Sequence, residues 1–184
     1  MTVARINRIS NFEGQTVQLN GWVYNSRRSG KIGFLMLRDG FGLIQCIVAK
    51  NDVGEEKFGM FKSLTQESSL SVNGEVVKND RAPGGFELIL SDLTVHQISS
   101  EYPITPKEHG TDFLMNNRHL WLRSKRQHAI LRVRHEIIKA IRDFFDSNDF
   151  TLCDSPIFTS NAAEGTSTLF STEYFGETAY LAQT

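Results

Sequence analysis

Four side chains in the N-terminal half could together bind a nucleobase and its phosphate. Arg27 and Arg28 precede Phe34, and Gln45 follows the turn at Asp39-Gly40, which places Phe34 opposite residue 45 to within about one pair. An aromatic ring can stack on an unpaired base, an amide can read the edge of that base, and an arginine can bind phosphate. The pattern predicts a face that binds single-stranded nucleic acid. The alternative is that Phe34 belongs to a core and the basic residues only solvate a loop.

A strongly basic segment covers residues 118–142, with eight Lys/Arg and one Asp/Glu, whereas residues 143–184 contain seven Asp/Glu and no Lys/Arg. The basic side chains could bind phosphates or pair with the acidic segment, and local charge compensation is the commoner outcome. His135-Glu136 begins a HExxH-like pattern, but its last position is Lys139, so a zinc-protease site is excluded. The candidate phosphate-binding residues are Arg118, His119, Arg123, Lys125, Arg126, Arg132 and Arg134.

A third candidate is a loop of small residues around one carboxylate, at residues 161–167. Its single acidic residue, Glu164, could accept hydrogen bonds from a cationic group of a ligand. A solvated glutamate on a surface loop is the simpler interpretation of this loop alone. The sequence contains neither a P-loop nor a Gly-x-Ser-x-Gly nucleophile motif.

The elements that must position the first site are short strands within residues 1–98. Alternating apolar residues predict five strands, and Phe58, Phe61 and Leu64 at helical spacing predict a helix between the third and fourth strands. This order is typical of an OB barrel, which binds single strands on one face, although other small barrels and sandwiches share much of the pattern. The predicted strands cover residues 17–23, 32–37, 43–48, 70–76 and 86–95, and the helix covers 55–64.

Residues 99–123 break the strand rhythm and predict an extended connector, because a residue before proline avoids helical backbone and two such pairs occur here. A helix is expected from Ser124 to about Ser147, followed by a strand over 150–158 that Pro156 confines to an edge or an end. The predicted domains are therefore 1–98, 99–123 and 124–184. The helix carries one expected buried stripe, formed by Ile130, Val133, Ile137, Ile141 and Phe144.

Composition excludes several classes of protein. The chain has 184 residues, a formal net charge of −1 and 40% hydrophobic residues, which is typical of soluble globular proteins. Its apolar runs are much shorter than the ~20 residues that span a bilayer, and the N-terminus lacks the apolar region of a secretory signal. Cys46 and Cys153 form no CxxC pair, which excludes a disulfide scaffold and a zinc ribbon. We therefore expect a cytoplasmic protein.

Several motifs, taken in order, resemble the class IIb aminoacyl-tRNA synthetases, the aspartyl, asparaginyl and lysyl group. The long helix and the strand reaching Pro156 resemble motif 1 of that family, and the segment around Glu164 resembles its amino-acid loop. Tyr180-Leu181-Ala182-Gln183 is similar to the start of the next binding strand. The barrel motifs that resemble the anticodon-binding domain are Gly21-Trp22-Val23, Arg27-Arg28, Phe34, Leu37-Arg38-Asp39 and Gln45. The connector is most similar to that of asparaginyl enzymes at Glu101-Tyr102-Pro103-Ile104, Lys107-Glu108-His109-Gly110 and Arg118-His119-Leu120-Trp121-Leu122-Arg123.

The resemblance covers essentially the whole chain, and it implies a fold and a set of roles. The fold would be an OB barrel followed by the start of an α+β class II catalytic domain with an antiparallel sheet. Phe34 would stack on the middle anticodon base, Gln45 would read it and Arg27 would contact it. Glu164 would hold the α-ammonium group of asparagine, and Gln183 would contact the same amino acid. Residues implied at a homodimer interface are Pro156, Ile137 and Ile141.

The implied reaction is that of an asparagine–tRNA ligase. Asparagine would be activated with ATP and Mg²⁺ and transferred to tRNA(Asn), and the chain would bind no membrane. The resemblance places motifs 2 and 3, which carry the main ATP ligands, beyond residue 184. We therefore expect the given residues to contain no catalytic residue or metal ligand and to be inactive alone. The alternatives are an aspartyl enzyme that accepts both tRNAs and a stand-alone tRNA-binding OB protein without ligase activity.

Overall fold

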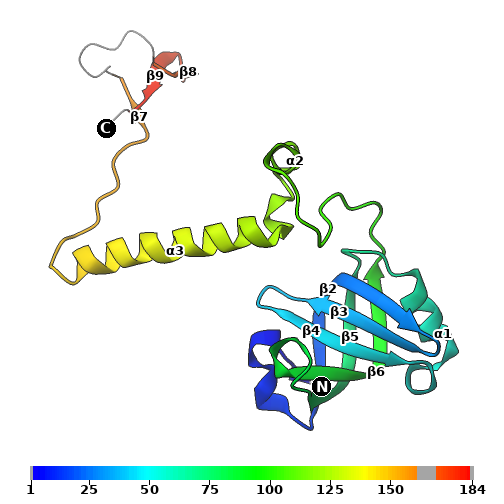
Figure 1. Cartoon of the computed structure of the whole chain (residues 1–184). Helices are drawn as coiled ribbons and strands as arrows, with labels where there is room; N and C mark the ends of the chain where they lie inside the picture. Colours follow the sequence, from blue (N-terminus) through cyan, green and yellow to red (C-terminus); the bar gives the residue numbers. More distant parts are fainter. Residues whose placement is uncertain (1, 161–168, 183–184) are drawn as a thin grey trace. The chain divides into compact units, whose positions relative to one another are not determined.

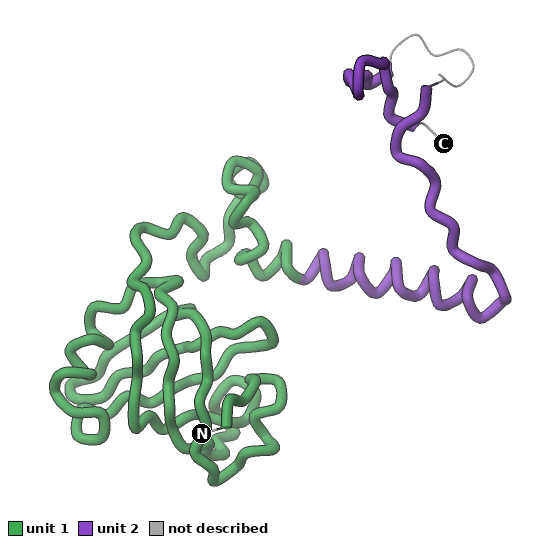
Figure 2. The backbone as a smooth tube through the Cα atoms, turned by 180° about the vertical axis from the view of Figure 1, so that it is seen from behind, with its two compact units in different colours: residues 1–128 green, residues 129–184 purple. Residues whose placement is uncertain are grey.

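The computed structural model describes residues 2–160 and 169–182. The chain divides into two compact units, residues 1–128 and 129–184 (Figure 2). The domain boundaries expected after residues 98 and 123 stay predictions, and each unit is described by itself below.

The first unit contains a closed barrel of five strands with a short additional strand at its edge (Figure 1). The strand order is β1-β2-β3-β4-β6-β5, and pairing of β2 with β5 closes the sheet. This arrangement confirms the predicted OB barrel. Its strands are β1 (Thr2–Val3), β2 (Thr16–Ser29), β3 (Ile32–Arg38), β4 (Leu43–Ala49), β5 (Ser69–Lys78) and β6 (Phe86–Gln97). Two 3-10 helices accompany them, Ile6–Phe12 and Pro83–Gly85.

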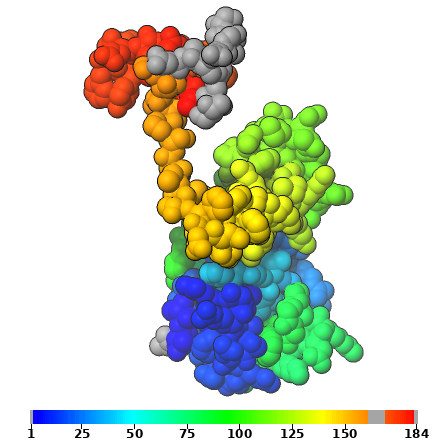
Figure 3. Space-filling model, turned by 90° about the vertical axis from the view of Figure 1, so that its left-hand side faces the viewer, coloured from blue at the N-terminus to red at the C-terminus, as the bar shows by residue number. Residues whose placement is uncertain are grey.

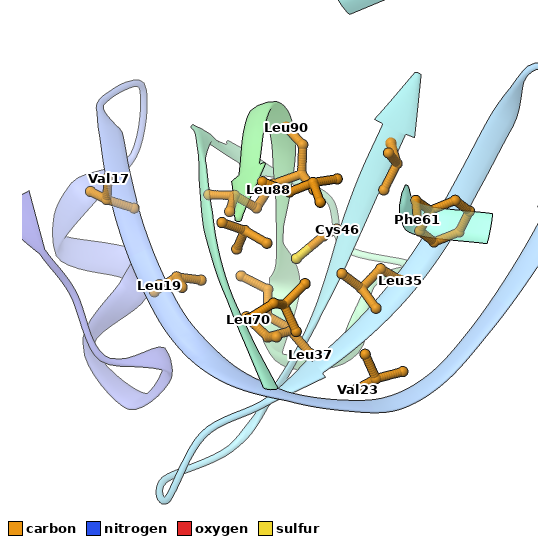
Figure 4. Close-up of a cluster of buried hydrophobic side chains, with 14 of the residues drawn as sticks. Val17, Leu19, Val23, Leu35, Leu37, Cys46, Phe61, Leu70, Leu88 and Leu90 are labelled. Carbon is orange, nitrogen blue, oxygen red and sulfur yellow. The ribbon is translucent and has the colours of Figure 1, made fainter. Parts of the chain in front are cut away.

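The barrel closes around a core to which every long strand contributes (Figure 4). The alternation in β2 buries Val17, Leu19 and Val23 and leaves their neighbours outside, as the period-two pattern predicts. Two glycines allow adjacent strands to approach closely: a Cβ on Gly21 would lie 2.4 Å from the carbonyl oxygen of Arg38, and one on Gly74 would lie 2.3 Å from that of Ile89. Substitution of either glycine would therefore push two strands apart.

Helix α1 (Lys50–Ser63) supplies aromatic side chains to this core. Phe58 and Phe61 are buried, with ring centroids 5.9 Å apart. The helix begins five residues earlier than the predicted 55–64 and contains a break at Gly54, where φ is 82°. The apolar spacing in the sequence therefore revealed the part of the helix after the break and missed Val53 before it, which is also buried in the core.

The turn between β3 and β4 contains four residues, 39–42, and sets the register of the hairpin. The Asp39 carboxylate accepts hydrogen bonds from the backbone N–H groups of Phe41 (2.7 Å) and Gly42 (2.9 Å). As a result Phe34 pairs with Ile47, and Gln45 pairs with Met36. Phe34 and Gln45 are thus diagonal neighbours rather than direct partners. Because side chains alternate along a strand, this displacement by two residues keeps both on the same face.

The connector is attached to the barrel by the loop between α1 and β5. Thr65 Oγ1 donates a hydrogen bond to the Ser99 carbonyl (2.6 Å), and Gln66 Nε2 donates one to the carbonyl of Ile104 (2.7 Å), whose side chain is buried. The next loop residue, Glu67, has a left-handed backbone with φ of 65°. The connector contains α2 (Thr111–Asn116) and a 3-10 turn, Trp121–Arg123.

Glu67 is the centre of an ion-pair cluster. Its carboxylate accepts two hydrogen bonds from the Arg38 guanidinium, at 2.7 and 2.6 Å, and lies 3.6 Å from Nε of Arg123 in the connector. The side chains of Arg38 and Glu67 are only 15% and 6% exposed. Partial burial raises the pKa of the nearby Tyr102 phenol, and the charge of Glu67 raises it further. One buried carboxylate therefore links β3, the 65–68 loop and the end of the connector.

The second unit contains most of α3 (Lys125–Asp146) and a small antiparallel sheet. The sheet has the order β7-β9-β8, from β7 (Phe158–Thr159), β8 (Ser171–Tyr174) and β9 (Glu177–Leu181). The predicted long helix is thus confirmed. None of the described helices is long and apolar enough to cross a membrane.

One expectation for this part of the chain is wrong, and another stays a prediction. The described residues leave the apolar stripe of α3 exposed, with its five side chains 48–63% exposed, so its burial against a partner stays a prediction; α3 is the yellow segment in Figure 3. The predicted strand over 150–158 is extended coil except for Phe158–Thr159 (Figure 1). A strand needs a neighbouring strand with which to form backbone hydrogen bonds, and no described strand pairs with residues 150–157. In addition, Pro156 has no N–H group to donate.

We expect the two cysteines to differ sharply in reactivity toward iodoacetamide. Cys46 is fully buried in the barrel core and burial raises the pKa of its thiol far above the usual range, whereas Cys153 is exposed. Mass spectrometry of the native protein should therefore find alkylation at Cys153 alone. The urea-unfolded chain, as the control, should be alkylated at both positions. Equal labelling of the native protein at both cysteines would contradict the closed barrel.

Candidate nucleic-acid interface

A β-bulge in β2 turns the predicted site outward. Residues 17, 19, 21 and 23 face the core, so strict alternation would also direct Arg27 inward. The register of the β2–β3 pairing shifts between Val23 and Asn25, with Tyr24 as the extra residue. Beyond it Arg27 pairs with Phe34 on the outer face. The bulge is therefore what brings these two side chains together.

Phe34 lies on the outer face of β3, between the buried residues Gly33 and Leu35, and is half-buried. The Arg27 guanidinium carbon lies 4.3 Å from the centroid of the Phe34 ring. Beside the ring is a hollow of about 60 Å³, lined by Asn25, Ser26, Arg27, Phe34, Leu35, Met36 and Gln45. The hollow is much smaller than a nucleobase. A base can therefore stack on Phe34 only if Arg27 moves from the ring face and contacts the base itself.

The Gln45 amide is oriented by a residue that the sequence did not reveal. Gln45 Nε2 donates a hydrogen bond to Oε2 of Glu87 (3.3 Å), and Asn79 Nδ2 donates to the same oxygen (3.0 Å). Because a carboxylate only accepts, the Gln45 amide nitrogen must face Glu87. Its carbonyl oxygen and second N–H are left for a ligand. The signal that would have identified Glu87 is the parallel pairing of β4 with β6, in which Gln45 lies opposite Glu87.

Two basic residues at and just after the end of the connector contact aromatic rings of β2. Arg123 lies 5.3 Å from the ring centroid of Trp22, and Lys125 lies 5.6 Å from that of Tyr24. Within residues 2–160 and 169–182, the segment 118–142 forms ion pairs from Arg123 to Glu67 and from Lys139 to Asp143. Only the second involves the acidic segment 143–184. Local charge compensation therefore accounts for a small part of the basic segment in the described structure.

Of the other predicted site residues, the structure describes Ile137, Ile141 and Pro156. Glu164 and Gln183 lie outside the described residues. Ile137 and Ile141 are exposed on α3, and Pro156 is exposed in the coil that follows it. In the described ranges, no three His, Cys, Asp or Glu side chains are grouped so that they could hold a metal ion. Residues 27, 34 and 45 are thus the predicted site that the described structure assembles.

Two family models match adjacent parts of the chain. The OB-fold nucleic acid binding domain matches residues 17–95, and the class II tRNA synthetases (D, K and N) match residues 110–184. The asparagine–tRNA ligase of Sorangium cellulosum (strain So ce56) is 62% identical over 171 residues, which cover 92% of this chain and 38% of the relative. That of Symbiobacterium thermophilum (strain DSM 24528 / JCM 14929 / IAM 14863 / T) is 55% identical over 179 residues, 97% of this chain and 41% of the relative. The chain therefore spans about two fifths of the length of these curated relatives.

Solved structures agree with this relationship. The asparaginyl-tRNA synthetase from Pyrococcus horikoshii complexed with asparaginyl-adenylate superimposes with a TM-score of 0.89 at 39% identity, over 98% of this chain and 42% of that one. A putative aspartyl-tRNA synthetase from Leishmania major Friedlin gives a TM-score of 0.85 at 27% identity, over 100% and 38% of the two chains. An OB-fold nucleic acid binding segment followed by a segment similar to the class II tRNA synthetases (D, K and N) is thus found in both the sequence and the structure comparisons.

Proposed function

We propose that this chain forms the anticodon-binding barrel and the first part of the catalytic domain of an asparagine–tRNA ligase. The observation that supports it most directly is the outer face on which Arg27, Phe34 and Gln45 surround one hollow. An aromatic ring, an oriented amide and a guanidinium are groups that can together recognise one unstacked base. The asparagine–tRNA ligases at 62% and 55% identity favour asparagine over aspartate as the amino acid.

In the proposed reaction, the asparagine carboxylate attacks the α-phosphate of ATP, which releases pyrophosphate and forms asparaginyl-adenylate. A hydroxyl group at the 3′ end of tRNA(Asn) then attacks the asparaginyl carbonyl, the bond to the phosphate breaks, and AMP is released. We propose that Glu164 binds the α-ammonium group of asparagine through a charge-assisted hydrogen bond and that Gln183 contacts the same ligand. Bound Mg²⁺ would neutralise charge on the ATP phosphates. The described side chains do not form a site for it, so no role in this step is assigned to them.

We also propose that the exposed stripe of α3, with Ile137 and Ile141, and the Pro156 segment are covered by a second copy of the complete enzyme. A helix with one apolar face normally buries that face. The absence of a membrane-crossing helix among the described residues is compatible with a cytoplasmic enzyme.

The test of anticodon binding is titration of the chain with tRNA(Asn) transcripts that differ only in the middle anticodon base. We expect tighter binding of the unchanged anticodon. Equal affinity for all four bases would refute the proposal. ATP–pyrophosphate exchange with asparagine and with aspartate, measured on this chain and on any longer form, separates a ligase from a stand-alone tRNA-binding protein. Exchange at full rate by residues 1–184 alone would contradict the need for further motifs.

Replacing Glu87 with alanine is expected to reduce base discrimination more than affinity. Without its carboxylate partner the Gln45 amide can rotate, and its donor and acceptor no longer face the base in one arrangement. The loss should be about 1 kcal/mol, the contribution of one net hydrogen bond, and should appear as a reduced preference for the native middle base. The matched control is Glu75→Ala, which removes an exposed carboxylate on β5. Unchanged base preference in Glu87→Ala would show that Gln45 needs no such orientation.

A further inference from the structure

A second pocket adjoins the base-binding hollow at the end of the barrel. It has a volume of about 340 Å³ and lies between the last residues of β2 and the last turn of α1. Its lining consists of Ser26, Arg27, Arg28, Phe61 and Lys62. Three of these five residues are cationic and none is acidic. The site predicted from the sequence included Arg27 and Arg28, but it did not include Lys62.

The bulge and one glycine build this pocket. Beyond the bulge Arg28 lies opposite Gly33, while Arg27 lies opposite Phe34. A Cβ on Gly33 would lie 2.3 Å from a ring carbon of Phe61, so only glycine lets the buried Phe61 ring close the barrel end here. Arg28 from the strand and Lys62 from the helix thereby line the same cavity as Phe61.

The cations of the pocket are not neutralised by the described part of the chain. Neither Arg27, Arg28 nor Lys62 forms an ion pair with any carboxylate in residues 2–160 and 169–182. Lys62 lies over the Phe58 ring, 5.2 Å from its centroid. The pKa of Glu55 is lowered mainly by Lys50, with which it forms an ion pair, and the charge of Lys62 makes only a minor contribution to that shift. Three clustered, unpaired cations at a surface cavity favour an anionic ligand.

The position of the pocket points to the kind of anion. Ser26 and Arg27 line both this pocket and the hollow at Phe34. Because side chains alternate along a strand, the pocket and the hollow lie on the two sides of β2, at residues 25–29, where β2 pairs with β3 alone and has a free edge that a strand of RNA can cross. Proteins that bind single strands combine aromatic rings for the bases with a cationic groove that follows the phosphates. Arginine can also bind phosphate through two parallel N–H donors. We propose that Arg28 and Lys62 bind a backbone phosphate of the RNA whose base stacks on Phe34, an inference that rests on the proposed anticodon-binding function.

The test is the salt dependence of binding between the complete chain and an anticodon stem-loop RNA of tRNA(Asn). For single strands the slope of log K against log salt is about −0.7 per phosphate contact. Arg28→Ala and Lys62→Ala should each make the slope shallower. The double variant should lose about one phosphate contact, which corresponds to a change in slope of about 0.7. The loss should be the same for RNAs with the native and a changed middle base, because a phosphate has no base identity. Arg28→Lys should retain most of the slope.

Matched controls separate this effect from general charge. Arg8→Ala and Lys107→Ala remove exposed cations outside the pocket and should leave the slope unchanged. Wild-type slopes in the Arg28→Ala, Lys62→Ala double variant would overturn the phosphate site. If Phe34→Ala still weakened binding in that case, anticodon recognition would stand without it. A wild-type chain that ignores the middle base would instead refute the proposed function. Binding of millimolar inorganic phosphate to the wild-type chain that is lost in the double variant but does not compete with the RNA would identify a site for free anions and overturn the backbone assignment.

Discussion

Glu67→Ala is expected to lower the free energy of unfolding by about 3–5 kcal/mol, the usual cost of removing one partner of a buried ion pair. The substitution leaves the Arg38 guanidinium, 15% exposed, without its two carboxylate hydrogen bonds. It also removes the ion pair to Arg123, and with it the link from β3 to the end of the connector. Urea unfolding should therefore show a lower midpoint. Hydrogen exchange should accelerate in residues 99–123.

Two further variants isolate the cause of this loss. Glu55→Ala removes an exposed carboxylate whose ion pair with Lys50 lies at the surface, so it should change the unfolding midpoint little. Glu67→Gly also removes the ion pairs but relieves the left-handed backbone at φ 65°, so it should be more stable than Glu67→Ala by roughly 1 kcal/mol. A Glu67→Ala protein within 1 kcal/mol of the wild type would show that the cluster does not hold the connector to the barrel.

Phe34→Ala is expected to weaken binding of the anticodon stem-loop RNA by about 1–3 kcal/mol, or roughly 5- to 150-fold in dissociation constant, through loss of base stacking. Phe34 lies on the outer face of β3, and the core beneath it is formed by its neighbours on the strand. The substitution should therefore change the unfolding midpoint little. Fluorescence anisotropy with labelled RNA measures the first effect, and urea unfolding measures the second.

Phe61→Ala is the matched aromatic control. Phe61 is 2% exposed in the core, so its truncation should destabilise the protein by about 3–5 kcal/mol. Phe34→Tyr should retain the stacking surface and most of the affinity. Unchanged RNA affinity in Phe34→Ala, combined with a loss of stability like that of Phe61→Ala, would assign Phe34 to the core and remove it from the interface.

The sequence by itself determined the five long strands of the barrel, the helix packed on them and the chemistry of the candidate base-binding face. Alternation in residues 17–23 and the apolar run 43–48 after the Asp39-Gly40 turn predict strands, and the spacing of Phe58, Phe61 and Leu64 predicts the helix. The ordered motifs around Phe34 and Gln45 also indicated the family. These signals are local, because periodicity and turn chemistry act within a few residues of the chain.

Only the tertiary structure decided which distant residues meet. The bulge at Tyr24 determines that Arg27 faces outward, and the parallel pairing of β4 with β6 determines that Glu87 orients Gln45. The role of Glu67 depends on arginines 29 residues before it and 56 residues after it. The predicted strand over 150–158 failed for the same reason, since an extended segment becomes a strand only beside a partner. Local patterns specify which face of an element is apolar; the partner that covers it is determined by contacts between segments far apart in the sequence.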